Sequence, residues 1–205
     1  MDNNQIASQI DLMAKLMELH GENSFKTKNY AFAVTMIKKV NEPLDNIAAI
    51  QNSGLGAAVQ AKLIELVNTG QIAALDELIQ QTPEGVIDIL NVKGLGPKKV
   101  AVLWKEYGID SLESLESACI ENRLMTIKGF GLKTQAKIYE QIEFLKDNQG
   151  YVLWKQADDW KLQLESLFES QFDGLLTFVG AYALQMPILN ELECYTTADL
   201  QEIHD

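Results

Sequence analysis

Apolar residues recur at helical spacing along most of this chain. Ile6, Ile10, Met13, Leu16 and Met17 form a stripe that predicts a helix over residues 6–19. The same period, with glycine and proline breaks between segments, predicts further helices. Four of them are expected to begin at sequence signals: one after the N-cap Ser24, one after the N-cap Thr82 with Pro83 as its first residue, one at Pro97, which ends at Gly108, and one at Ser111. The others are expected over residues 44–50, 57–67, 72–79, 133–145 and 154–168.

The pattern changes after Gly150. Two short apolar runs, residues 175–179 and 188–195, predict strands. We therefore expect a mainly α chain of two small helical domains, residues 1–82 and 83–150. An α/β segment, residues 151–205, follows them, and its few strands predict that the chain is part of a longer protein.

Three glycine hairpins punctuate the helical region: hairpin 1 (residues 54–56), hairpin 2 (94–96) and hairpin 3 (129–131). Residues 89–101 match residues 124–136 position for position in character, and residues 47–56 open a third copy. Glycine suits a backbone that turns through positive φ, and a backbone that something approaches closely. The repeat predicts helix, tight turn and helix.

A helix that starts directly after such a turn presents unpaired amides and the positive end of its dipole. Gly54, Gly56, Gly94, Gly96, Gly129 and Gly131 are the candidate positions for close approach. Lys98, Lys99 and Lys133 fall in first helical turns, where a cation is unfavourable unless an anion docks beside it. The pattern predicts a helix-hairpin-helix that binds nucleic-acid phosphates and is blind to base sequence.

The three copies do not support this hypothesis equally. Hairpin 1 is followed by Ala57 and Ala58 in place of lysines, so an ordinary glycine turn between packed helices explains it as well. Hairpins 2 and 3 lie 35 residues apart, and both have lysines. For them, phosphate binding is the favoured interpretation.

The net charge of −12 is unevenly distributed. Residues 1–90 carry 6 basic and 11 acidic residues, residues 91–150 carry 9 and 8, and residues 151–205 carry 2 and 10. The basic residues therefore concentrate around hairpins 2 and 3. We expect modest, salt-sensitive binding rather than tight binding by the isolated chain.

Several features bear on compartment and partners. The sequence has no apolar run of 18 residues and no secretory leader, so we expect no membrane contact. Cys119 and Cys194 lack metal-site spacing and predict reduced thiols in a cytoplasmic protein. His20 and His204 are interpreted as surface or helix-end residues. A monomer is favoured.

The order of these elements resembles the N-terminal region of a bacterial family X DNA polymerase. The segments GENSFK (21–26), GLGPKK (94–99) and KGFGLKT (128–134) carry the resemblance, which covers residues 5–150. It implies a partner in gapped or nicked DNA and a role in gap-filling (base excision) repair. It also implies a potassium or sodium ion on the carbonyls of the hairpins around Gly94 and Gly129.

The resemblance further implies an abasic-site lyase residue. The family's Schiff-base lysine falls on Lys62, and Lys26 and Lys28 match neighbouring basic positions and a 5′-phosphate seat. A Schiff-base lysine needs a lowered pKa. Other basic positions of that pocket fall on Ala58 and Ala74, so an ordinary solvated helix lysine explains Lys62 equally well.

The resemblance also locates the family's polymerase motif. Gly180 is followed by Ala181 where the family has serine, and the arginine pair is missing. Glu191 and Glu193 stand where the family has two metal-binding aspartates. Each glutamate is one methylene longer, which disfavours the octahedral geometry of magnesium. Either the motif has degenerated or both glutamates are outward residues of an edge strand, and we favour the second.

Three hypotheses of function follow. The first is a DNA-binding module that does not itself extend a primer. The second is an enzyme, either an abasic-site lyase using Lys62 or a remnant nucleotidyltransferase. Borohydride trapping on abasic DNA distinguishes the DNA-binding module from the enzyme. The third is a helical scaffold whose hairpins bind protein.

Overall fold

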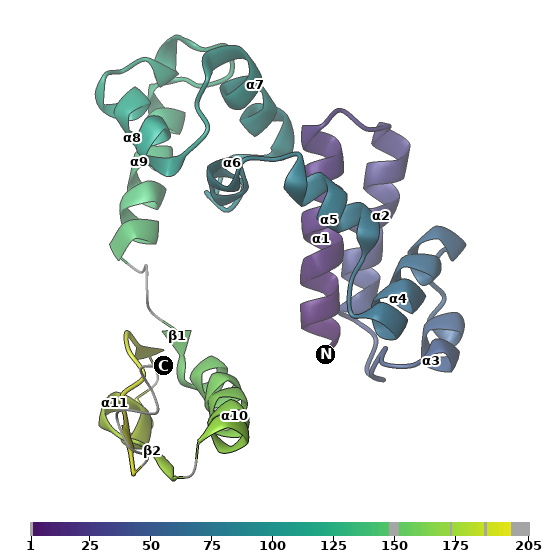
Figure 1. Cartoon of the computed structure of the whole chain (residues 1–205). Helices are drawn as coiled ribbons and strands as arrows, with labels where there is room; N and C mark the ends of the chain where they lie inside the picture. The colour runs from purple at the N-terminus through teal and green to yellow at the C-terminus, as the bar shows by residue number, and fades with distance from the viewer. Residues whose placement is uncertain (1, 148–151, 173, 187, 198–205) are drawn as a thin grey trace. The chain divides into compact units, whose positions relative to one another are not determined.

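The computed structural model describes residues 2–147, 152–172, 174–186 and 188–197. The chain divides into two compact units, Met1–Glu143 and Phe144–Asp205 (Figure 1). The predicted domain boundary after residue 82 falls inside the first unit, between two of its helices, and stays a prediction.

The first unit is helical, as the sequence predicts. Its elements are α1 (Asn3–Leu19), α2 (Ser24–Ile37), α3 (Ile47–Asn52), α4 (Ala57–Thr69), α5 (Ala73–Gln80), α6 (Glu84–Ile89), α7 (Pro97–Tyr107), α8 (Leu112–Ile120), the 3-10 turn η1 (Leu124–Thr126) and α9 (Leu132–Asp147). Hairpin 3 is therefore preceded by a 3-10 turn, not by the α-helix that the repeat predicts.

The predicted starts of α2 and α6 are wrong by one residue. Asn23, not Ser24, caps α2, because its side chain accepts a hydrogen bond from the Phe25 amide at 2.8 Å. Pro83 is the residue before α6 rather than its first residue. The predicted glycine stops are confirmed, since Gly70 and Gly108 end α4 and α7 with φ of +76° and +66°.

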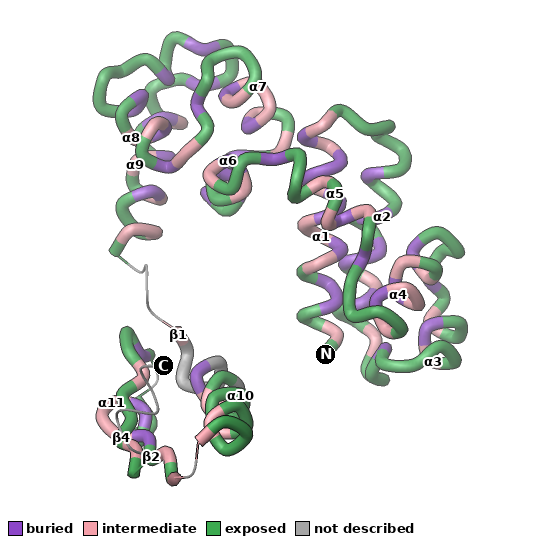
Figure 2. The backbone as a smooth tube through the Cα atoms, in the orientation of Figure 1, coloured by how far each residue is buried: buried purple, intermediate pink, exposed green. Residues whose placement is uncertain are grey.

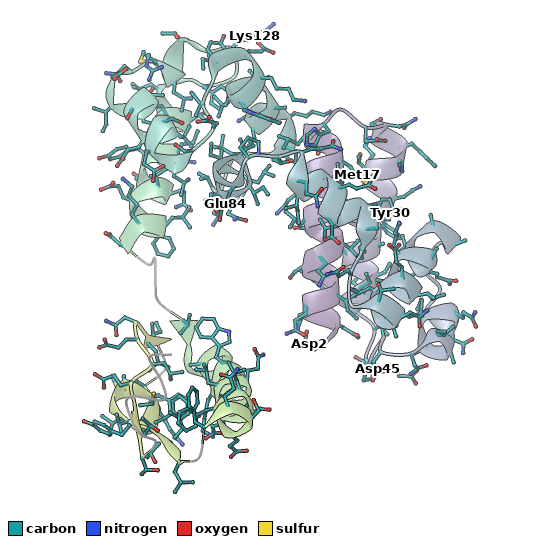
Figure 3. All side chains as sticks on the ribbon, in the orientation of Figure 1. Asp2, Met17, Tyr30, Asp45, Glu84 and Lys128 are labelled. Atoms are coloured by element: carbon teal, nitrogen blue, oxygen red, sulfur yellow. The ribbon has the colours of Figure 1, made fainter. Side chains whose placement is uncertain are left out.

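The core of the first unit forms along α1. Its buried stripe, with Ile6, Ile10 and Met13 at most 1% exposed, packs against α2, α5 and α7 (Figure 2). Met17 and Tyr30 lie between α1 and α2 (Figure 3). The period of 3.6 residues places these side chains on one face, and burial of that face joins the helices.

A polar joint links the end of α1 to α7. His20, the C-cap of α1, lies with its Nε2 2.8 Å from Thr82 Oγ1 and its ring edge-on to Trp104 at 5.8 Å. The Thr82 hydroxyl donates to the Leu78 carbonyl, so His20 Nε2 is the donor in the first contact. Lys105 Nζ donates to the Leu19 carbonyl at 3.1 Å.

We expect protonation of His20 to weaken the folded unit. Burial, and then the Lys105 ammonium, lowers the pKa of His20 from its usual 6.5. Its contribution to stability is therefore complete above the unfolded value and is lost as pH falls through the folded pKa. Denaturant unfolding of the parent and of His20→Asn, at about pH 7.5 and about pH 5.5, tests this. The stability difference should shrink at the lower pH, and an equal difference at both contradicts the prediction.

The second unit combines helices with short strands. Its elements are β1 (Val152–Leu153), α10 (Trp154–Gln171), β2 (Leu176–Phe178), α11 (Gly180–Ala183), β3 (Ile188–Leu189) and β4 (Cys194–Thr196). β1 pairs antiparallel with β3, and β2 pairs antiparallel with β4. Ala157, Phe178, Tyr182 and Leu189 form its core. The fold class is thus mainly α with a small α/β segment, as predicted.

The single strand predicted over residues 188–195 is wrong. Ile188 and Leu189 pair with β1, whereas Cys194, Tyr195 and Thr196 pair with β2. The two pieces belong to different sheets, so the chain must leave strand geometry between them. Residues 190–193 form that connection.

In the described part of the chain, no helix combines the length and apolarity needed to cross a bilayer. Cys119 is buried and Cys194 is exposed, and both are free thiols. The prediction for His204 falls outside the described residues.

Candidate nucleic-acid interface

Hairpins 2 and 3 are built on the same backbone turn. The Leu95 amide donates to the Val92 carbonyl at 3.1 Å, and the Phe130 amide donates to the Ile127 carbonyl at 3.0 Å. The third residue of each turn is a glycine, Gly94 or Gly129, with φ of +97° and +92°. Only glycine adopts this conformation without strain, so the first glycine of each hairpin is required by the turn.

The second glycine of each hairpin starts a helix. The Gly96 carbonyl accepts from the amides of Lys99 and Val100 at 2.9 and 3.1 Å, and the Gly131 carbonyl accepts from the two equivalent amides of α9. No side chain caps α7. A Cβ added at Gly96 or Gly131 meets no atom within 4 Å. Amides and dipole therefore face open space that a phosphate can enter.

The middle residue of each hairpin fixes the turn to the core. Leu95 is 6% exposed and Phe130 is 2% exposed. Lys99 Nζ lies 5.3 Å from the centre of the Phe130 ring, so a first-turn lysine of hairpin 2 contacts the anchor of hairpin 3. Hairpins 2 and 3 are thus joined by a direct side-chain contact.

A hollow of about 510 Å³ lies between hairpin 2 and α9. Lys93, Lys99 and Lys137 line it, with Glu140 as its acidic residue; we call it the lysine hollow. Among the described residues, no acidic side chain forms an ion pair with these three lysines or with Lys133. The concentration of unpaired ammonium groups favours an anion at this surface.

Lys137 lines the lysine hollow but is not among the DNA-binding residues predicted from the sequence. It follows Lys133 by four residues on α9, and residues at that spacing share a helix face. The helical period around Lys133 therefore contained the signal. Lys128, the residue before hairpin 3, is also exposed (Figure 3).

The predicted lysines differ in their surroundings. Lys98 and Lys99 both lie in the first turn of α7, as predicted, and Lys133 lies in the first turn of α9. Lys98 Nζ is 3.9 Å from Glu18 Oε1 on α1, and its side chain is 79% exposed. This loose pair leaves Lys98 available, but the structure does not bring it to the lysine hollow.

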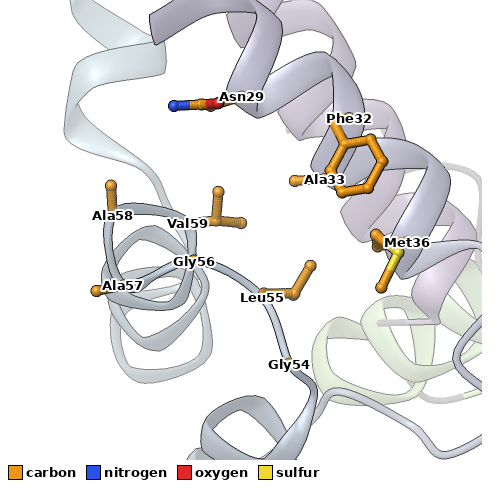
Figure 4. A pocket seen from close by; sticks show the side chains of 10 residues that line it. All are labelled: Asn29, Phe32, Ala33, Met36, Gly54, Leu55, Gly56, Ala57, Ala58 and Val59. Atoms are coloured by element: carbon orange, nitrogen blue, oxygen red, sulfur yellow. The ribbon is translucent and has the colours of Figure 1, made fainter.

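Hairpin 1 has the same kind of first glycine and helix start as the other two, but it lacks their charges, and its Leu55 amide donates to Ser53 Oγ at 3.3 Å instead of closing the backbone turn. Gly54 has φ of +72°, and the Gly56 carbonyl accepts from Val59 and Gln60 at 2.9 and 3.0 Å. Leu55 is buried. Its surroundings are apolar rather than basic, as Figure 4 shows.

Lys62 and Lys26, two of the candidate lyase residues, are engaged in separate ion pairs. Lys62 Nζ donates to Glu65 Oε2 at 2.8 Å, and Lys26 Nζ lies 3.5 Å from Glu22 Oε2. The hydrogen bond from Lys62, followed by one from the Ala73 amide, lowers the pKa of Glu65. Lyase activity stays a prediction.

Glu191 and Glu193 lie in the connection between β3 and β4, and both are exposed. The interpretation as edge-strand residues is therefore wrong, because the run divides between two sheets. A Cβ on Gly180 would lie 2.0 Å from Glu193 Oε2, so that carboxylate covers Gly180. Within the described ranges, no group of three or more histidine, cysteine, aspartate or glutamate residues is placed to hold a metal ion.

Comparison with known proteins matches both helical segments. Residues 1–72 match the model of a helix-hairpin-helix domain, and residues 86–143 match that of a SAM-like helix-hairpin-helix tandem. The DNA polymerase/3′-5′ exonuclease PolX of Bacillus subtilis (strain 168) is 31% identical over 143 residues, 69% of this chain. The helical part of the chain is homologous to family X DNA polymerases.

DNA polymerase lambda of Rattus norvegicus is a second relative, 26% identical over 115 residues, 55% of this chain. The matched segments make up 25% of the Bacillus protein and 19% of the rat protein. The chain thus spans a quarter or less of the length of these relatives. The two family models together include all three hairpins.

Proposed function

We propose that this chain binds the DNA backbone without base preference through hairpins 2 and 3, and that it is the DNA-binding part of a family X polymerase. The observation that carries the proposal is the lysine hollow beside two adjoining hairpin turns. Lys93, Lys99 and Lys137 converge there without ion-pair partners among the described residues, next to helix starts whose amides face outward. Phosphates satisfy both the amides and the lysines.

Base-independent binding follows from the groups involved. Main-chain amides and ammonium groups contact phosphate oxygens, which are the same at every nucleotide. The two hairpins provide two such contact points on a strand. The proposed partner is gapped or nicked DNA, and the proposed role is gap-filling repair in the cytoplasm of a bacterium. A potassium or sodium ion on the hairpin carbonyls around Gly94 and Gly129 belongs to the same proposal.

The lysines should account for the salt dependence of binding. Each lysine that neutralises a duplex phosphate contributes about 0.9 to the slope of log affinity against log salt concentration. We expect Lys99→Ala, Lys133→Ala and Lys137→Ala each to lower that slope by about this amount, and the triple variant to lower it by the sum. Titration of a fluorescent gapped duplex with each protein across a salt series measures this slope.

Lys161→Gln is the matched control, since Lys161 pairs with Glu165 at 2.7 Å in the second unit. Its slope should equal that of the parent. A triple variant with the parent slope would move the DNA contacts to another surface.

A further inference from the structure

Hairpin 3 differs from hairpin 2 in the segment that leads into it. Hairpin 2 follows α6, and the amide of Leu90, the C-cap of that helix, donates to the Val86 carbonyl at 3.2 Å. Hairpin 3 follows the 3-10 turn η1, and Met125 takes the position of Leu90 in the 35-residue repeat. A turn of three residues offers its first amides no acceptor of its own, so the Met125 amide requires a partner from another segment.

The side chain of Gln135, on α9, is that partner. The Met125 amide donates to Gln135 Oε1 at 2.9 Å, and Gln135 Nε2 donates to Asn122 Oδ1 at 2.8 Å. A backbone N–H only donates, so the side-chain oxygen must face Met125, and this turns the nitrogen toward Asn122. We call this pair of hydrogen bonds the glutamine bridge. Gln135 is 5% exposed, so the bridge is buried.

The far end of the bridge is also fixed. Asn122 has φ of +57°, and its amide donates to the Cys119 carbonyl at 3.1 Å. The next amide, that of Arg123, donates to the Ala118 carbonyl at 2.9 Å. These two bonds form a Schellman end of α8, with asparagine in the left-handed position that glycine more often takes. The glutamine bridge therefore ties α9 both to the end of α8 and to η1.

Hairpin 2 has an apolar residue at the equivalent position. Val100 stands four residues after the second glycine of hairpin 2, as Gln135 does in hairpin 3, and Val100 is 0% exposed. Because α6 satisfies the Leu90 amide by itself, an apolar side chain is sufficient there. The change from valine to glutamine between the two copies thus accompanies the change from α-helix to 3-10 turn. Packing alone does not explain it, since valine fills the buried position in hairpin 2.

We propose that Gln135 is the positioning residue of hairpin 3, holding the start of α9 in the orientation that binds a phosphate. The proposal rests on DNA binding by hairpins 2 and 3. The Gln135 amide donates to the Gly131 carbonyl at 3.0 Å and so helps to close the first turn of α9. Its side chain fixes the segment that enters the hairpin. One residue therefore orients both arms of the turn, and its own side chain is bonded inside the unit rather than to the phosphate.

Hydrogen exchange tests the bridge without DNA. Gln135→Met keeps the length of the side chain and removes both hydrogen bonds. The Met125 amide should exchange at least about threefold faster in this variant than in the parent, whereas the Leu90 amide should exchange at the parent rate. Parent-like protection of the Met125 amide in the variant would overturn the proposal.

A double-mutant cycle with a fluorescent gapped duplex separates positioning from general loosening of the fold. Gln135→Met should weaken binding at least about threefold, both in the parent and in Gly96→Val, where hairpin 3 is intact. In Gly131→Val, where valine already blocks the phosphate at hairpin 3, the same change should have no further effect. Equal losses in the Gly96→Val and Gly131→Val backgrounds, or no loss in the parent, would overturn the proposal.

Two further variants support this cycle. Gln163→Met is the matched control, because Gln163 is an exposed glutamine of α10, and this variant should bind like the parent. Asn122→Gly is the milder change, since glycine adopts φ of +57° without strain and only the bond from Gln135 Nε2 is lost. It should remain folded and weaken binding by a smaller factor, again with no further effect in Gly131→Val. A loss that persists in that background would overturn the proposal.

The two proposals fail in distinguishable ways. If hairpins 2 and 3 do not bind DNA, Gly131→Val leaves the affinity unchanged, while exchange of the Met125 amide still responds to Gln135→Met. If only Gln135 is misassigned, Gly131→Val lowers the affinity and Gln135→Met binds like the parent.

Discussion

Valine at both Gly96 and Gly131 should lower the affinity for gapped DNA by at least about 100-fold. Each hairpin presents amides to one phosphate, and hydrogen bonds to a charged group contribute about 1.5–3 kcal/mol. That is about tenfold or more per hairpin. A branched side chain on the second glycine occupies the space that the phosphate needs.

The same variants should remain folded. Gly96 has φ of −89° and ψ of 163°, which any residue adopts, and its added Cβ meets nothing within 4 Å. Gly94 is unsuitable for this test, because its φ of +97° makes every substitution strained. The loss of affinity at Gly96 and Gly131 therefore reports on access of the phosphate rather than on folding.

Fluorescence anisotropy with a gapped duplex measures the affinity, and circular dichroism checks the fold. Ala136→Val is the matched control: it adds valine to an exposed position of α9 that lines a different hollow, beside Cys119 and Tyr139. It should bind like the parent, and relative preference among base sequences should not change in any variant. Parent-like binding by a folded double variant would refute the phosphate contacts.

Alanine at Gly85 should destabilise the first unit by about 2 kcal/mol or more. Gly85 lies in α6, where alanine is favoured over glycine by about 1 kcal/mol in a helix interior. In this structure, however, its Cβ would lie 2.4 Å from the Asp110 carbonyl oxygen and 2.9 Å from Ser111 Cα. Both are backbone atoms at the start of α8, so the helices must move apart.

Urea unfolding of the parent and Gly85→Ala measures this effect. Asp88→Ala is the matched control in the same helix. Asp88 is exposed, but partial desolvation, followed by the Glu84 and Glu113 carboxylates, raises its pKa, so removal of its charge should cost no stability. A Gly85→Ala protein as stable as the parent would show that α6 and α8 do not pack as closely as described.

Much of the candidate interface was predictable because it is local. Gly94 and Gly129 follow from the positive φ of a four-residue turn, and the placement of Lys98, Lys99 and Lys133 follows from where a helix starts. The ion pair of Lys62 with Glu65 is local as well, since the two residues are three apart on α4. The spacing of three residues on a helix by itself indicates this ion pair.

Other features depended on contacts between distant segments. Lys98 is directed to Glu18 and Lys99 to Phe130 by packing that joins residues far apart in the chain. The run 188–195 divides because its two halves pair with different strands, a choice that its own β propensity does not encode. A hollow lined by Phe32 and Met36 of α2 and by Leu55 of hairpin 1 likewise joins segments that are distant in the sequence.

The sequence by itself determined the helices, their glycine stops and the three hairpin turns, since each depends on the φ and ψ of a few consecutive residues and on side chains three or four positions apart. The tertiary structure decided which lysines meet in one hollow, which are neutralised, and why Gly85 must be glycine. Those outcomes depend on the distance between helices, which is set by the packing of every side chain at their contacts and not by any local segment.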